Sequence, residues 1–155
     1  METEARLHAI EERLAALEGG ASPRRETGGD LWVLDSIADS VIFAGDVRTD
    51  AGHAQYQWER PTTLLLDEDW APHLDRLAAL AHPVRGAILR RLLDAPATVG
   101  DLVDDKVATS TGTAYHHLGA LQAGGWITKK AGGRWSVCTA RVVPLLTIIA
   151  ATEDH

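Results

Sequence analysis

The chain has almost no cysteine and no long apolar run, and each absence excludes a class of protein. Cys138 is the single cysteine among 155 residues, so no disulfide can form within the chain. A disulfide-stabilised secreted domain is therefore excluded, and a reducing, cytoplasmic setting is expected. No apolar stretch reaches the roughly 18 residues of a membrane span, which predicts no membrane partner. Residues 1–18 are charged and also lack the apolar core and cleavage site of a secretory signal.

The sequence also lacks the groupings that carry catalysis. It contains no Ser/His/Asp grouping, paired carboxylate cluster, phosphate-binding loop or dinucleotide fingerprint. The adjacent His116 and His117 look like a ligand pair, but neighbouring residues on a helix point about 100° apart and cannot easily share one ion. We therefore expect no enzyme activity, no cofactor and no metal.

Acidic residues are missing from one part of an otherwise acidic chain. The net charge is −7, yet residues 106–152 carry five basic side chains and no acidic one. A basic face on an acidic protein can bind phosphate, while the acidic remainder limits non-specific affinity. The five cations are Lys106, Lys129, Lys130, Arg134 and Arg141.

The N-terminal region predicts a helix followed by a linker. Within residues 1–18, apolar residues follow the a/d spacing of a coiled coil, and glycines end the pattern. This helix either pairs with a second copy or docks on its own domain. Residues 19–30 are a linker by composition.

Residues 31–73 predict an accessory segment built around a β-hairpin. The strands are expected at Ser40–Val47 and His53–Arg60, because both are rich in β-branched or aromatic residues and Asp50-Ala51-Gly52 supplies a turn between them. A short helix is expected at 31–39, and a further helical stretch from Leu64 to Asp75.

Residues 74–155 contain three helices with clear start signals. Pro83 suits the first turn of one helix, and Thr98 with Asp101 forms a capping-box pair at the start of the next. Ser110 is the expected N-cap of a third helix, which runs to Gln122. This order predicts a helix-turn-helix.

Two short strands follow the third helix and predict a wing. Residues 126–130 and 134–138 flank an Ala-Gly-Gly turn, and Lys129, Lys130 and Arg134 lie near its tip. A basic hairpin directly after a helix-turn-helix places cations on the DNA backbone or in the minor groove. The expected fold is therefore α+β, mainly α: a winged helix-turn-helix domain with an N-terminal helix and β-hairpin extension.

The third helix has the pattern expected of a recognition helix. One face gathers Ala114, Leu118, Leu121 and His117 and is expected to face the core, with Gly112 and His116 on the opposite face. His117 is expected at the edge of the core with its polar atoms satisfied. Small residues followed by hydrogen-bonding side chains suit a helix in the major groove. Ser110, Thr111 and the wing cations would hold phosphates, while Thr113, Tyr115 and His116 would contact bases. The candidate DNA-binding residues are Thr98, Ser110, Thr111, Thr113, Tyr115, His116, Lys129, Lys130 and Arg134.

About half of the chain, roughly residues 74–152, resembles the ArsR-type winged-helix repressors. The resemblance rests on three segments in order: 77–85 (LAALAHPVR), 98–102 (TVGDL), and 110–121 (STGTAYHHLGAL) followed by Gly-Gly-Trp-Ile. It implies DNA binding and dimerisation through terminal helices. Many relatives bind metals through a Cys-x-Cys pair or through Asp and His of the last helix. The pair is absent here, and the last helix offers only Glu153, Asp154 and His155 at its end, so no metal site is carried over.

The last helix predicts a homodimer. From Val142 to Thr152 it has no charge and is apolar on nearly all sides, so we expect a partner copy to cover what one small domain cannot. Two recognition helices would then meet an inverted repeat. The candidate dimer residues are Leu7, Ile10, Leu14, Leu17, Val142, Leu145, Leu146 and Ile149.

The sequence therefore predicts a homodimeric, sequence-specific transcription regulator, most simply a repressor, with double-stranded DNA as its partner. Two alternatives stay open: a winged-helix protein-interaction module, and a regulator that responds to a small molecule. The aromatic residues of the N-terminal part build a core, line the pocket for such an effector or enlarge the dimer interface. The candidate pocket residues are Trp32, Phe43, Tyr56, Trp58 and Trp70.

Overall fold

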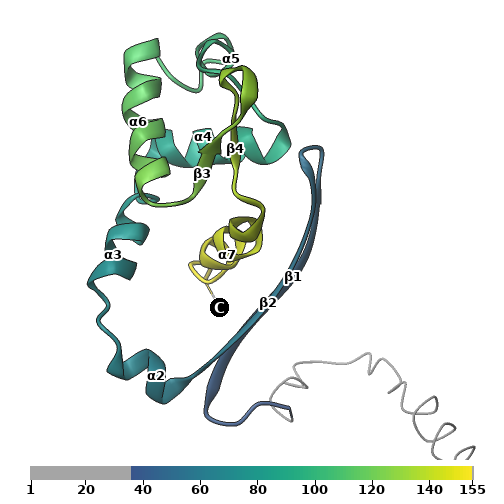
Figure 1. Ribbon diagram of the computed structural model, residues 1–155, viewed down its shortest axis with the longest axis vertical. Coiled ribbons are helices and arrows are strands. Elements are labelled where there is room, and N and C mark those ends of the chain that lie inside the picture. The colour runs from purple at the N-terminus through teal and green to yellow at the C-terminus, as the bar shows by residue number, and fades with distance from the viewer. Residues whose placement is uncertain (1–35, 155) are drawn as a thin grey trace, which may run out of the picture. The chain divides into compact units, whose positions relative to one another are not determined.

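The computed structural model describes residues 36–154, which belong, apart from Ser36, to one compact unit spanning Ile37–His155. The helix expected at 1–18, the linker at 19–30 and Trp32 lie outside the described residues. The unit contains α2 (Thr62–Asp67), α3 (Ala71–Ala78), α4 (Pro83–Asp94), α5 (Val99–Asp104), α6 (Thr111–Ala123) and α7 (Thr139–Ala150). Its strands are β1 (Ser40–Thr49), β2 (Gly52–Pro61), β3 (Ile127–Lys129) and β4 (Trp135–Val137). Figure 1 shows their arrangement.

The fold is α+β and contains a winged helix-turn-helix. Helices α4, α5 and α6 pack around one core, and β3 and β4 form an antiparallel wing joined by a short 3-10 turn, Ala131–Gly133. A single bridge between Ala97 and Trp135 connects the segment before α5 to the wing. The largest fully buried core side chains are Ile88, Leu92, Leu102, Leu118, Leu121 and Val143.

The helix starts that the sequence predicts are confirmed. Thr98 accepts a hydrogen bond from the N–H of Asp101, whose carboxylate in turn accepts the N–H of Thr98, so the capping box is complete. Ser110 caps α6 by accepting the N–H of Thr113. The start of α4 adds a cap that the sequence analysis did not include, because Nδ1 of His82 accepts the N–H of Val84 at 3.1 Å.

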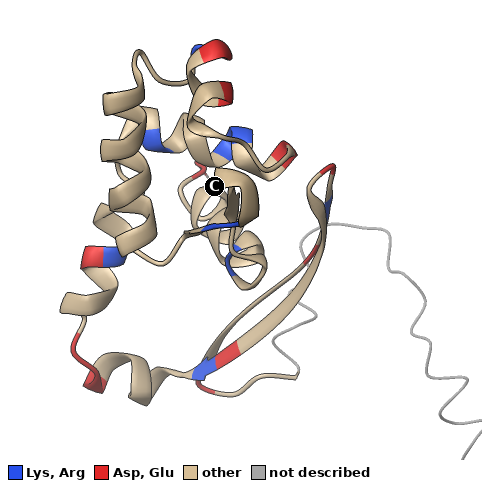
Figure 2. Cartoon of the chain, turned by 45° about the horizontal axis from the view of Figure 1, so that its top comes forward, with Lys and Arg blue, Asp and Glu red and all other residues tan. Residues whose placement is uncertain are grey.

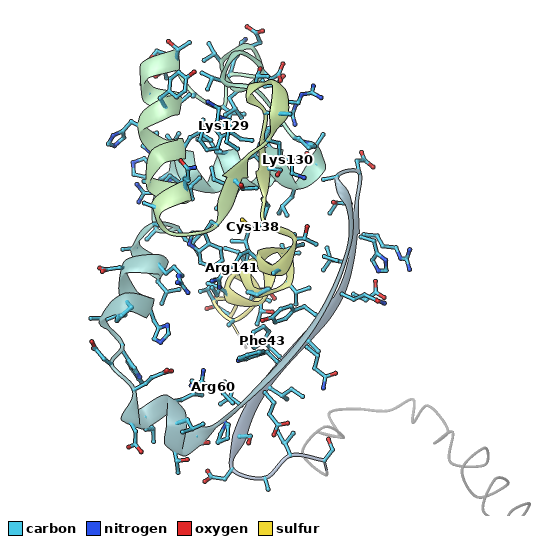
Figure 3. The ribbon with its side chains drawn as sticks, viewed as in Figure 1. Phe43, Arg60, Lys129, Lys130, Cys138 and Arg141 are labelled. Carbon is cyan, nitrogen blue, oxygen red and sulfur yellow. The ribbon has the colours of Figure 1, made fainter. Side chains whose placement is uncertain are left out.

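The predicted hairpin is confirmed and is slightly longer than expected. Odd-numbered residues of β1 share one face with even-numbered residues of β2, since Gly45 pairs with Tyr56 and Phe43 with Trp58. This face packs on α7, as Figure 3 shows for Phe43. At Gly45 a Cβ would lie 2.8 Å from Cγ1 of Val143, so only glycine lets the strand approach α7 this closely.

The helix expected at 31–39 is wrong for the part that the structure describes. Residues 36–39 form a turn and bends, and Asp39 adopts a positive φ of 48°. The carbonyl of Asp39 accepts the N–H of Thr62 at 2.9 Å, so this segment closes the open end of the hairpin instead of continuing a helix.

The single helical stretch expected from Leu64 to Asp75 is also wrong, because the chain breaks between α2 and α3. Glu68 is extended, and the indole N–H of Trp70 donates to the carbonyl of Leu65 at 2.7 Å. Asp69 then accepts the N–H of Ala71 and so helps to start the second helix. Neither α2 nor α3 contains a buried residue.

The last helix was expected to begin at Arg141 but begins at Thr139, and its apolar surface is partly covered by the chain itself. Hairpin strands β1 and β2 both contact α7, and Leu145 belongs to the core that α7 shares with the winged domain. The chain therefore covers part of this apolar helix itself, where the sequence favoured a second copy. Within residues 36–154, no helix combines the length and apolar character needed to cross a membrane.

Candidate nucleic-acid interface

The outer face of α6 is uncharged and exposed. Tyr115 is 57% exposed and His116 is also exposed, whereas Ala114, Leu118 and Leu121 are buried as predicted. Figure 2 shows α6 without a basic or an acidic residue. Gln122 lies seven residues after Tyr115, which places it on the same face of the helix, and it is exposed. Sequence analysis missed Gln122, although this two-turn spacing was the signal for it.

Two glycines on α6 have no packing role within the chain. A Cβ at Gly119 would meet nothing within 4 Å, and one at Gly112 would meet only the Ser110 hydroxyl at 3.9 Å. A glycine inside a helix costs about 1 kcal/mol relative to alanine. These two glycines therefore lower the stability of the helix, although packing within the chain does not require them. Because they have no side chains, another molecule can approach this face of the helix closely.

Hydroxyl groups gather at the N-terminus of α6. The hydroxyls of Ser110 and Thr113 lie 3.0 Å apart, and the Thr109 hydroxyl donates to that of Thr113 at 3.4 Å. Thr111 is exposed and Thr113 is half-buried. These hydroxyls and the free N–H groups of the first turn provide donors for a phosphate, in the position expected for a helix at the edge of a groove.

Thr98 is less suited to phosphate than predicted. Its hydroxyl oxygen and its N–H are both occupied by Asp101 in the capping box. The hydrogen bond from the backbone N–H of Thr98 holds the pKa of the Asp101 carboxyl below its ordinary value, and the charge of Arg134 acts in the same direction. The site beside Thr98 therefore carries a negative charge.

The three wing cations are not equivalent. Nζ of Lys129 lies 5.6 Å from the centre of the Trp135 ring, a cation–π contact that holds it against the wing. Arg134 is exposed near Asp101, as the effect of its charge on that carboxyl indicates. Lys130 lies on the side of the wing that faces the hairpin turn, as Figure 3 shows.

Three histidine rings lie close together where α6 meets the start of α4: His116 and His117 of α6, and His82, the N-cap of α4. The ring of His117 is 4.5 Å from that of His82 and 5.0 Å from that of His116, measured between centroids. His117 is buried as predicted, at 7% exposed, but the expectation that it is satisfied is wrong, because Nδ1 has no hydrogen-bond partner among the described residues. Burial lowers the pKa of His117, and the nearby charges of His82, His116 and Arg85 lower it further.

The predicted effector residues do not form one cluster. Phe43, Tyr56 and Trp58 stack in a row along the hairpin, with ring centroids 5.8 and 6.4 Å apart. Trp70 lies between α2 and α3 and is exposed. A cavity of about 150 Å³ lies instead at the turn end of the hairpin, and of the residues predicted for any site only Lys130 and Val142 line it.

The predicted dimer residues on α7 also differ from one another. Ile149 is exposed, and Val142 and Leu146 are half-buried. Leu145 is buried in the core of its own chain, so it offers no surface to a partner and is corrected here to a core residue. Leu7, Ile10, Leu14 and Leu17 lie outside the described residues. Within residues 36–154, no group of three or more His, Cys, Asp or Glu side chains is arranged so that it could hold a metal ion.

Comparison with solved structures shows a likeness to a known domain. The chain is similar to the solution structure of a homodimeric winged helix-turn-helix DNA-binding domain from Mycobacterium bovis, described as a possible ArsR-family transcriptional regulator. The two are 27% identical, the match covers 60% of this chain and 93% of the other, and the TM-score is 0.38. No protein-family model matches the chain, and no curated protein does.

Proposed function

We propose that this protein is a homodimeric, sequence-specific DNA-binding regulator that represses transcription from an inverted-repeat operator. The observation that carries the proposal is the outer face of α6, which is uncharged and bears two glycines that packing does not require. A major-groove helix needs close approach at some positions and hydrogen-bonding side chains at others, and this face offers both. Tyr115, His116 and Gln122 are the candidate base readers.

The surroundings of α6 support contact with phosphates. Ser110 and Thr111 stand at its N-terminus, and Lys129, Lys130 and Arg134 extend from the adjacent wing. In this proposal the hydroxyls and wing cations fix the register of the protein on DNA, and the side chains of α6 supply the sequence preference. Binding therefore weakens steeply with salt.

Exposed apolar side chains on several elements support dimerisation. Large apolar side chains that belong in a core lie exposed along the end of the hairpin, α2, α3 and the end of α7: Val41, Trp58, Leu64, Leu66, Trp70, Leu74, Leu77 and Ile149. Monomeric proteins seldom expose large contiguous apolar patches, so these side chains are candidates for burial by a partner. A second copy that packs on this surface by two-fold symmetry would bury it and present two α6 helices to successive major grooves.

Selection of binding sites from a random DNA pool tests the proposal. We expect an enriched inverted repeat, bound with a steep salt dependence by a dimer. Charge reversal at Lys129, Lys130 and Arg134 together should abolish this binding. Weak binding that is the same for every sequence, and unaffected by the charge reversal, would favour a protein-interaction module instead.

A further inference from the structure

The accessory hairpin leaves both of its edges unpaired. In the described part of the chain, β1 and β2 are each ten residues long and form a sheet of two strands. Their register is continuous from Ser40 opposite Pro61 to Thr49 opposite Gly52, so no bulge interrupts either strand. Natural proteins usually protect such long edges, because the unpaired N–H and C=O groups along them bind another strand. The edges of this hairpin are therefore candidates for strand pairing.

The register identifies the backbone groups that point outward. Thr62 continues the register opposite Asp39, and its N–H donates to the carbonyl of Asp39 at 2.9 Å. Hydrogen-bonded pairs alternate along an antiparallel ladder, so odd-numbered residues of β1 and even-numbered residues of β2 direct their N–H and C=O groups at each other. Pro61 has no N–H and agrees with this pattern, because it occupies an outward position. The outward groups of β2 thus belong to His53, Gln55, Gln57 and Glu59.

The outer edge of β2 is unprotected. Within residues 36–154, the backbone groups of its four outward residues make no hydrogen bond with any other segment. The four residues are exposed. Lysine and proline are the residues that commonly block an edge, and neither occurs between His53 and Glu59. This edge can therefore accept a further strand.

The edge of β2 is complementary to itself. Two copies of β2 that run antiparallel about a two-fold axis at Tyr56 bring the outward residues of both copies opposite one another. Gln55 then lies opposite Gln57 of the second copy, and His53 lies opposite Glu59 of the second copy. Opposed polar side chains of this kind stabilise neighbouring strands. The overlap covers the whole outward stretch of β2.

Contacts within the chain leave the matching atoms available. Nε2 of Gln55 donates to Asp46 at 2.8 Å, so its Oε1 can accept from the amide of Gln57 of the second copy. Nε2 of His53 lies 2.7 Å from Asp46, so its Nδ1 is left for Glu59 of the second copy. Glu59 makes no ion pair within residues 36–154. Both side-chain pairs are therefore matched as donor and acceptor.

The edge of β1 is less complementary to itself. Its full overlap about Ala44 sets Ile42 opposite Asp46 of the second copy, so an apolar side chain faces a carboxylate. It also sets Ser40 opposite Arg48 of the second copy, and neither of these pairs gives opposite charges or an aromatic contact. The side-chain pairs therefore favour β2 as the edge that is joined.

The other face of the hairpin supports the same partner. Tyr56 would meet its own copy at the axis, in a non-hydrogen-bonded pair whose side chains lie close together. Trp58 lies on this face, is 46% exposed, and is one of the apolar side chains assigned above to a second copy. Edge pairing thus adds backbone hydrogen bonds to that apolar contact.

We propose that two copies of this chain pair through the outer edges of β2 and form a four-stranded antiparallel sheet with the order β1-β2-β2-β1. The inference rests on the dimer of the proposed function and names the strand that joins its two halves. The accessory hairpin is then a dimerisation element, and it sets the separation of the two α6 helices.

Proline substitution tests the edge and spares the hairpin. Gln57→Pro removes an outward N–H that β1 does not use, so the hairpin should remain while pairing with a second copy is lost. At a concentration at which the original chain is a dimer, sedimentation should show a monomer. Ala44→Pro is the matched control, because it removes an outward N–H from β1 and should remain dimeric. Circular dichroism shows whether each variant keeps its structure.

Charge substitution tests the register. In the double variant Gln55→Glu, Gln57→Glu, like charges lie opposite each other across the axis, and the dissociation constant of the dimer should rise about tenfold. The double variant Gln55→Glu, Gln57→Lys loses the same hydrogen bond to Asp46 but opposes unlike charges. It should therefore dimerise at least as tightly as the original chain.

The outcomes separate the pairing from the proposed function. A dimer that survives in folded Gln57→Pro, or that responds alike to both charge variants, overturns the pairing and leaves a dimer held by the apolar side chains. A folded but monomeric Ala44→Pro overturns the choice of β2. If Gln57→Pro unfolds, the two charge variants decide. A dimer paired through β2 that prefers no DNA sequence upholds the inference and refutes the DNA-binding function.

Discussion

Gly45 of β1 lies so close to Val143 of α7 that a Cβ on the glycine would be 2.8 Å from Cγ1 of the valine. Val143 is 2% exposed and β-branched, so it has little freedom to move away. This contact is the point at which the hairpin docks on the last helix.

The first prediction is that Gly45→Ala loosens this docking. The added methyl group forces the hairpin from α7, and we expect the free energy of unfolding to fall by about 1–3 kcal/mol. Urea denaturation measures it. The control is Ala44→Val on the opposite, exposed face of the strand, which should leave stability nearly unchanged. Equal stability of Gly45→Ala and the original chain would refute the close contact.

The second prediction separates stability from DNA binding at Gly119. Gly119→Ala should raise the free energy of unfolding by about 0.5–1 kcal/mol, because alanine favours the helix and meets nothing in the chain. The same change should weaken operator binding, because the methyl group faces the groove. Gly86→Ala in α4 is the matched control, since it also meets nothing within 4 Å and lies outside the candidate interface. It should stabilise the chain and leave operator affinity as it was.

The third prediction distinguishes base readers from phosphate contacts. Tyr115→Ala should reduce the preference for the operator over random DNA roughly tenfold and leave non-specific binding unchanged. Arg134→Ala should weaken binding to both DNAs and lower the salt slope by about one per protomer. Fluorescence anisotropy at several salt concentrations measures both quantities. Parallel losses in the two variants would contradict the division of roles.

The fourth prediction concerns pH and His117. Its pKa is lower in the folded chain than the unfolded value of about 6.5, so the unfolded chain binds more protons as the pH falls. The stability that His117 contributes is therefore complete above about pH 6.5 and is lost as the pH falls through the folded pKa. Denaturation at a series of pH values should give a shallower pH dependence for His117→Gln than for the original chain. His73→Gln, remote from the cluster, should keep the contribution of His117 and hence the steeper dependence.

The fifth prediction tests the dimer surface on α3. Leu74 and Leu77 are exposed one turn apart, so the double variant Leu74→Glu, Leu77→Glu places charge where the second copy would pack. Sedimentation should show a monomer that retains helical structure. Arg76→Glu adds negative charge to the same helix on a different side and should remain dimeric. A dimer in both cases would place the interface elsewhere.

Local signals in the sequence account for the parts that were predicted correctly. Ser110 and the Thr98–Asp101 pair are short-range caps whose partners lie three residues away, and the hairpin turn is likewise local. Such interactions can be predicted from a few neighbouring residues in the sequence. The winged helix-turn-helix follows from them because its elements occur in order with short connections.

The parts that were missed depend on contacts between distant residues. The break between α2 and α3 is an exception, because Pro72 in the first turn of α3 is a local signal for a helix start that was overlooked. The bond from Trp70 to Leu65 that accompanies the break depends on how the chain folds back. Nothing near Gly45 indicates that it meets Val143, and nothing near Ser136 indicates that the hairpin turn closes a cavity over it. The indole N–H of Trp126 similarly donates to the carbonyl of Arg76, fifty residues away in the chain.

The docking of the hairpin on α7 bears on where the winged helix-turn-helix part of this chain can be separated from the rest. Sequence resemblance begins near residue 74, yet the strand that covers Val143 lies thirty residues earlier, in the same compact unit. A fragment that starts at residue 74 would lose that cover and leave a terminal helix with an apolar flank open to water and to aggregation. We therefore expect the smallest piece able to fold independently to be longer than the region of recognisable sequence.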